Sequence, residues 1–109
     1  MKGGKGMEYD ERITRLCEEI AELVKPVRII MFHEKQKPTG ELVSFKLCVI
    51  VKENDCTKVE QKIYLTLECE VSFDVLVYSL EQWNSAMEDP DTYAYRGIKN
   101  GGVVLYESE

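Results

Sequence analysis

Asp74 is the only charged residue in the largely apolar run Val71–Tyr78, and Lys46 is the only charged residue in a second such run. His33 and Glu34 directly follow a third apolar run. Carboxylate and imidazole groups can hold a metal ion, whereas an ammonium beside a carboxylate can form an ion pair. Either chemistry requires that the segments carrying these residues lie side by side.

The three apolar runs predict three strands, at Val27–Phe32, Leu42–Val51 and Val71–Tyr78. Alternation along the second strand gives one fully apolar face made by Val43, Phe45, Leu47, Val49 and Val51. Its other face holds Leu42, Ser44, Lys46, Cys48 and Ile50 and is polar toward its start. On the third strand, Asp74 shares a face with Ser72, Leu76 and Tyr78. We expect any site on these polar faces, beside a polar loop at residues 34–41.

Two long segments favour helices. Glu8–Lys25 repeats apolar residues at helical spacing and is stopped by Pro26. Cys56–Glu70 starts with Thr57-x-x-Glu60, which matches a capping box.

The last part of the chain predicts two shorter helices and a strand. Ser79-x-x-Gln82 matches the start of a helix, and Asp91 is expected to cap a helix that ends near Gly101. Val103–Tyr106 reads as a final short strand. Aromatic and methionine residues at helical spacing are expected in the core, and any exposed part would suit a protein contact: Trp83, Met87, Tyr93 and Tyr95.

These elements predict an α/β domain, with a small mixed sheet and helices on one or both faces. We expect a single domain over residues 8–109 and a disordered tail over residues 1–7. No apolar run reaches the roughly 20 residues of a membrane span, and the start resembles no signal peptide. We therefore expect a cytoplasmic protein with free thiols, in which Cys17 and Cys48 pack in the core.

The net charge of −6 opposes direct binding of nucleic acid, which uses Lys and Arg to displace counterions from phosphates. The same charge is compatible with a basic protein partner. The cysteines form no Cys-x-x-Cys pair and the chain has one histidine, so a zinc site is not expected.

The order of these segments resembles that of the minimal nucleotidyltransferases. The interval from His33-Glu34 to Ser44-Phe45-Lys46 has the length that this family uses between a Gly-Ser pair and an Asp-x-Asp pair. FDVLVYSLEQW, followed by DPDTYAYRGIKNGGVVLYE, is similar to the family's ending: a strand Asp, a helix, a short helix with Tyr and Arg, and a last strand. The resemblance covers nearly the whole chain, from about Ile13 to Glu107.

The resemblance implies a degenerate site. In the family, the Asp-x-Asp pair and a third strand Asp hold Mg²⁺ for nucleotidyl transfer. This chain has His33-Glu34 in place of the Gly-Ser pair and has Ser44 and Lys46 in place of the two acids of Asp-x-Asp. Of the three acids it keeps only Asp74. We expect no catalysis, no metal and no cofactor, with Mg²⁺ required only if activity is retained. Lys46 would then occupy the space of the missing cation and pair with Asp74.

Small relatives in this family act as antitoxins or regulators of all-helical HEPN proteins. The resemblance therefore implies an interaction module with a helical HEPN-type partner, or with a second copy of itself. Two alternatives remain open: a nucleotide-binding sensor, and an active nucleotidyltransferase with an atypical site. An alternative metal site made by His33, Glu34 and Asp74 is also conceivable from the residue types.

Overall fold

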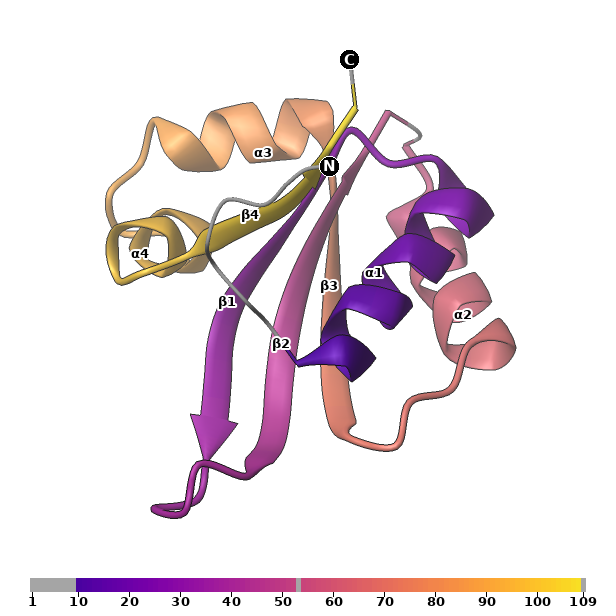
Figure 1. Cartoon of the computed structure of the whole chain (residues 1–109). Helices are drawn as coiled ribbons and strands as arrows, with labels where there is room; N and C mark the ends of the chain where they lie inside the picture. The colour runs from indigo at the N-terminus through magenta and orange to yellow at the C-terminus, as the bar shows by residue number, and fades with distance from the viewer. Residues whose placement is uncertain (1–9, 53, 109) are drawn as a thin grey trace.

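The computed structural model describes residues 10–52 and 54–108, which form a four-stranded mixed sheet and four helices (Figure 1). The helices are α1 (Glu11–Val24), α2 (Cys56–Thr66), α3 (Leu80–Met87) and α4 (Tyr93–Lys99). The strands are β1 (Arg28–Gln36), β2 (Leu42–Val51), β3 (Ser72–Ser79) and β4 (Val103–Glu107). The expected α/β class with a small mixed sheet is confirmed. Within these ranges, none of the helices has the length and apolar content that a membrane crossing needs.

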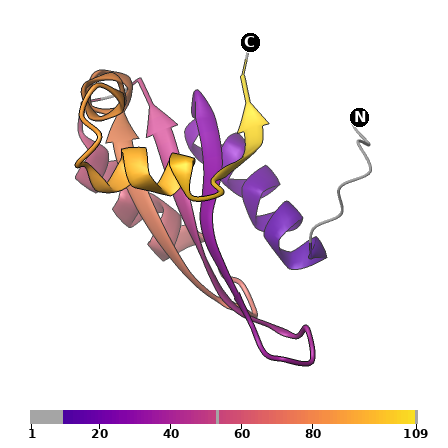
Figure 2. The same ribbon diagram turned by 90° about the vertical axis from the view of Figure 1, so that its left-hand side faces the viewer.

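The strand order across the sheet is β3-β2-β1-β4. β1 is antiparallel to both β2 and β4, whereas β2 and β3 are parallel. A parallel pair needs a crossover connection, and α2 supplies it between β2 and β3. α1 and α2 lie on one face of the sheet, and α3 and α4 lie on the other (Figures 1 and 2).

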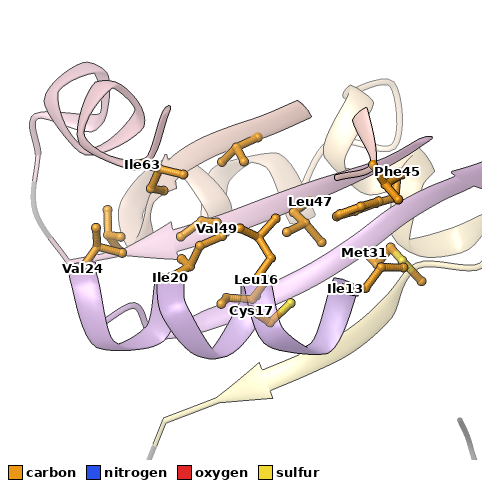
Figure 3. Close-up of a cluster of buried hydrophobic side chains, with 14 of the residues drawn as sticks. Ile13, Leu16, Cys17, Ile20, Val24, Met31, Phe45, Leu47, Val49 and Ile63 are labelled. Atoms are coloured by element: carbon orange, nitrogen blue, oxygen red, sulfur yellow. The ribbon is translucent and has the colours of Figure 1, made fainter. Parts of the chain in front are cut away.

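The main core lies between the sheet and the pair α1 and α2 (Figure 3). The buried face of α1 meets the apolar face of β2, as the alternation predicted. Its members include Ile13, Leu16, Cys17, Ile20, Phe45, Leu47, Val49, Val51 and Ile63. A smaller core lies under α3 and α4, where Trp83, Ala86 and Ala94 cover Ile30, Phe32, Cys48 and Ile50.

Two side-chain caps differ from those expected. α2 is capped by Asp55, which accepts a hydrogen bond from the backbone N–H of Lys58, and not by a box starting at Thr57. α4 is capped by Thr92 and not by Asp91. In both cases a neighbouring residue with an equally suitable oxygen takes the cap, because sequence alone leaves such boundaries open by one or two residues. The capping box that begins at Ser79 is confirmed.

Several element boundaries also differ from expectation. β1 continues to Gln36, so residues 34–36 are strand and not loop, since they pair with the start of β2. α2 ends at Thr66, and Leu67 is extended, which leaves residues 67–70 outside the helix. The expected tail at residues 1–7 and the first residues of the helix expected from Glu8 lie outside the described residues.

A bulge near the start of β2 changes the face of Leu42. Lys35 pairs with Ser44 while Gln36 pairs with Leu42, so Val43 is an extra residue opposite β1. Leu42 therefore joins the main core, and Val43 is 37% exposed. Simple alternation had placed Leu42 on the polar face and Val43 on the apolar face.

Gly97 of α4 lies against the ring of Phe32. A Cβ at position 97 would meet ring carbons of Phe32 at 2.8 Å. Gly97→Ala would gain about 1 kcal/mol of helix propensity, but overpacking of this kind costs about 1–3 kcal/mol. We expect a net loss of stability in chemical denaturation, whereas Asn84→Ala at an exposed site on α3 should not destabilise the protein. A stabilised Gly97→Ala variant would contradict the close packing.

Asp10 caps α1 and gives the protein a pH-dependent stability. Its carboxylate accepts hydrogen bonds from the side chain and the backbone N–H of Arg12, which lower its pKa from 3.8 to about 2. The folded-state pKa is depressed, so this stabilisation is complete above about pH 4 and is lost as the pH falls toward 2.

Asp10→Ala should therefore cost about 1 kcal/mol at neutral pH, the usual effect of losing an N-cap. Asp10→Asn is the matched control, because it keeps a capping oxygen but has no titrating carboxyl. Urea denaturation from pH 2 to pH 7 measures both effects. An unchanged pH dependence in Asp10→Asn would show that this carboxyl is not responsible.

Candidate functional site

The pairing of β2 with β3 places the predicted residues together. Lys46 is directly opposite Asp74, and Ser44 is directly opposite Ser72, in the parallel register. Directly paired residues project from the same face of a sheet, so the four side chains share one face. The predicted adjacency of the strands that carry Lys46 and Asp74 is confirmed. This is the face that α3 and α4 cover further along the strands, over Cys48 and Ile50.

A second bulge, at Phe32 of β1, brings His33 to the same face. Met31 pairs with Leu47 and His33 pairs with Lys46, so Phe32 is an extra residue between them. Without the bulge, strict alternation would have put His33 on the face of Met31, toward α1. With it, His33, Lys46 and Asp74 form a row across β1, β2 and β3.

The next row toward the hairpin turn holds Lys35, Ser44 and Ser72. We refer to the six residues of both rows, His33, Lys35, Ser44, Lys46, Ser72 and Asp74, as the polar sheet face. His33, Lys35 and Asp74 are exposed, and Lys46 is partly buried. Figure 2 shows α4 lying across the strands, with the β1–β2 hairpin extending well beyond it. The polar sheet face begins beside Tyr93 of α4, which contacts Lys46, and combines residues of β1, β2 and β3.

Tyr93, the first residue of α4, contacts the row from above. Lys46 Nζ donates a hydrogen bond to the Tyr93 hydroxyl at 3.1 Å and lies 5.3 Å from the centroid of its ring. The ring of Tyr93 is also 6.3 Å from that of His33 and 5.9 Å from that of Phe32. The hydrogen bond to Tyr93 raises the pKa of Lys46, and the negative charge of Asp74 adds to this effect. Lys46 is therefore protonated at neutral pH, and its ammonium is directed to the Tyr93 hydroxyl.

Sequence reasoning missed Tyr93 as a site residue. Its helical spacing with Trp83 and Met87 suggested a core position, and Trp83 is indeed buried. Tyr93 instead is 45% exposed. No local pattern in the sequence marks this position, because the contact of Tyr93 with Lys46 spans 47 residues and depends on how α4 packs on the sheet.

The expected ion pair between Lys46 and Asp74 is not formed at contact distance. The ion pairs of the described residues are Arg12–Asp10, Arg28–Glu107, Lys37–Glu41 and Arg96–Asp91. Lys46 turns to the hydroxyl of Tyr93, and Asp74 acts on it through its electric field. Because Asp74 is exposed to water, it needs no direct partner.

The alternative metal site made by His33, Glu34 and Asp74 is excluded by the register. Glu34 pairs with Phe45, so it lies on the sheet face opposite to His33. Within residues 10–52 and 54–108, no group of three or more His, Cys, Asp or Glu side chains is arranged to hold a metal ion. The polar sheet face thus offers one carboxylate, one imidazole and two ammonium groups.

The buried cysteines have no nucleophilic role in this arrangement. Cys17 and Cys48 are packed in the two cores, as expected, and burial raises the pKa of each thiol to about 12. A thiol with such a pKa is protonated at neutral pH, whereas the thiolate is the reactive form.

Comparisons with protein-family models, with curated proteins and with solved structures found no match to this chain. The site is a charged and hydroxyl-bearing face of the sheet, with the exposed ring of Tyr93 at its border.

The hydrogen bond between Lys46 and Tyr93 can be tested by titration. Tyr93→Phe removes the hydroxyl, so the pKa of Lys46 should fall, as measured by NMR of its side chain. The interaction that raises this pKa stabilises the folded protein fully below the unfolded value of 10.5 and is lost as the pH rises through the folded-state value, so Tyr93→Phe should lower stability at neutral pH and the difference should disappear at strongly basic pH. Tyr95→Phe, two residues further along the same helix, should leave the titration of Lys46 unchanged. Equal shifts in both variants would refute the assignment.

Proposed function

We propose that this chain is a catalytically inactive nucleotidyltransferase-like domain that works as an interaction module. One observation carries the proposal: an ammonium, Lys46, lies in the row between His33 and Asp74. In the family that the sequence resembles, this part of the sheet carries carboxylates. The proposed partner is a helical protein of the HEPN type or a second copy of the chain, in a cytoplasmic setting.

The chemistry of Mg²⁺ supports the loss of catalysis. Mg²⁺ takes oxygen ligands in near-octahedral geometry and relies on carboxylates to offset its charge. Asp74 is one carboxylate, and the Lys46 ammonium directly opposite it would repel a divalent cation. The raised pKa of Lys46 keeps this repulsion in place across the physiological range. Nucleotidyl transfer depends on metal to neutralise phosphate charge, so this face supports it poorly.

The exposed groups support a role in protein contact. Tyr93 is large, partly apolar and held by neighbours on two sides, and such residues are favoured at binding hot spots. Two polar side chains of the sheet, His33 and Lys46, lie beside it, as in the polar rim of a protein interface.

A nucleotide-binding sensor is the second candidate, and one observation favours it. Lys35, Lys46 and the hydroxyl of Ser44 project from one face, and all are suitable donors to phosphate. Glu34, which by sequence would repel phosphate, is on the other face. Against this candidate, the carboxylate of Asp74 lies in the same row as Lys46 and would repel a triphosphate.

Purified protein should transfer no nucleotide to itself or to a helical partner protein in the presence of Mg²⁺ or Mn²⁺. The assay is incorporation of labelled ATP, with Asp74→Ala as the test variant and Glu18→Ala, an exposed acid on α1, as the matched control. Incorporation that Asp74→Ala abolishes and Glu18→Ala leaves intact would refute the proposal. Calorimetric titration with ATP, with and without Mg²⁺, identifies the sensor if ATP binds without turnover.

A further inference from the structure

We infer that the polar sheet face binds an acidic segment of a partner protein, with Lys35 and Lys46 as its cationic contacts and Tyr93 as its aromatic anchor. The inference rests on the proposed interaction function and adds the sign of the partner's charge. That sign is opposite to the one suggested by the net charge of −6.

The charges on this face are separated by strand. Lys35 and Lys46 project from the β1–β2 hairpin, next to His33, while the single acid, Asp74, projects from β3. The other acid of the hairpin strands, Glu34, faces the opposite side because it pairs with Phe45. Adjacent strands are about 4.8 Å apart and paired rows about 7 Å apart, so one carboxylate can approach both ammonium groups.

Tyr93 gives this charged surface an ordered anchor. Its ring lies beside those of Phe32 and His33, and its hydroxyl accepts the hydrogen bond from Lys46. The side chain is 45% exposed despite these contacts. An interface residue that is already fixed loses little conformational entropy when a partner binds.

The edges of the sheet are poorly suited to strand addition by a partner. At the β3 edge, the backbone N–H of Val75 donates a hydrogen bond of 2.7 Å to the hydroxyl of Tyr64, so that position is not free to pair with a new strand. At the β4 edge, the strand is short and has a bulge at Leu105, since Ile29 pairs with Tyr106 and Ile30 with Val104. Short, bulged and covered edges resist strand addition.

A carboxylate-bearing protein segment fits the face better than a nucleotide does. The polar sheet face carries its two lysines on β1 and β2 and Asp74 on β3, which suits a protein surface with acidic residues and a nearby donor. A triphosphate concentrates its negative charge and would be repelled by Asp74.

NMR titration of the full chain with a short oligoglutamate peptide tests the inference. Amide shifts should concentrate at Lys35, Lys46 and Tyr93. An exposed ion pair is worth a factor of up to about five in affinity, so Lys46→Glu, which also adds repulsion, should weaken binding by about fivefold or more. Lys35→Glu should behave similarly, and Asp74→Asn should tighten binding.

Lys62→Glu is the matched control, because it makes the same charge change at an exposed site on α2, across the sheet. Lys46→Gln provides an intermediate variant without added repulsion and should weaken binding less. Equal weakening by Lys62→Glu and Lys46→Glu would overturn the inference, because binding would then follow net charge alone. Displacement of the peptide by ATP from the same residues would also overturn it, in favour of a nucleotide site. Neither result depends on the nucleotidyl-transfer assay. Failure of the inferred acidic partner can therefore be distinguished from failure of the proposed inactive interaction module.

Discussion

The packing of the Phe32 ring on Gly97 is the contact on which the site depends. Phe32 is the extra residue of a bulge in β1, and its ring lies where the side chain of any other residue at position 97 would be. The bulge turns His33 toward the polar sheet face, and the absent Cβ lets α4 come close enough to place Tyr93 over Lys46. A change at this contact would move the histidine, the tyrosine and the position of the ammonium together.

Period-2 alternation predicted the part of the site that lies on regular strands. Lys46 and Asp74 were placed on one face because the apolar residues of β2 and β3 allow only one orientation toward the main core, whereas their place on neighbouring strands was expected from the family layout that the sequence resembles. The predicted face of Leu42 was wrong, and the face of His33 was not predicted. In both strands a bulge adds one residue and reverses the alternation without a clear sequence signal. The contact between Lys46 and Tyr93 spans 47 residues of sequence and depends on how α4 packs, which local patterns do not encode.

The electrostatics of the site differ from those of the whole chain. A net charge of −6 describes the average surface, whereas the exposed hairpin presents lysines on one side and directs Glu34 to the other. The register of two strands, and not the composition, decides what a partner meets. For a small domain that we propose to work by contact, this local arrangement sets both the sign and the orientation of the encounter.

Tyr64 shows how a residue poorly suited to its own helix can serve the sheet. It lies in a β-rich run, IYLTL, that weakens the helical pattern of α2, yet its hydroxyl occupies the outer hydrogen-bonding position of Val75. The run itself has the composition of segments that assemble into fibrils when they are unfolded. Residues 63–66 of this run are helical and so are withdrawn from strand pairing, and the Tyr64 hydroxyl also occupies one hydrogen-bonding position at the edge of β3. One turn of helix thus removes an aggregation-prone run from strand pairing and occupies a position on the exposed edge of the sheet.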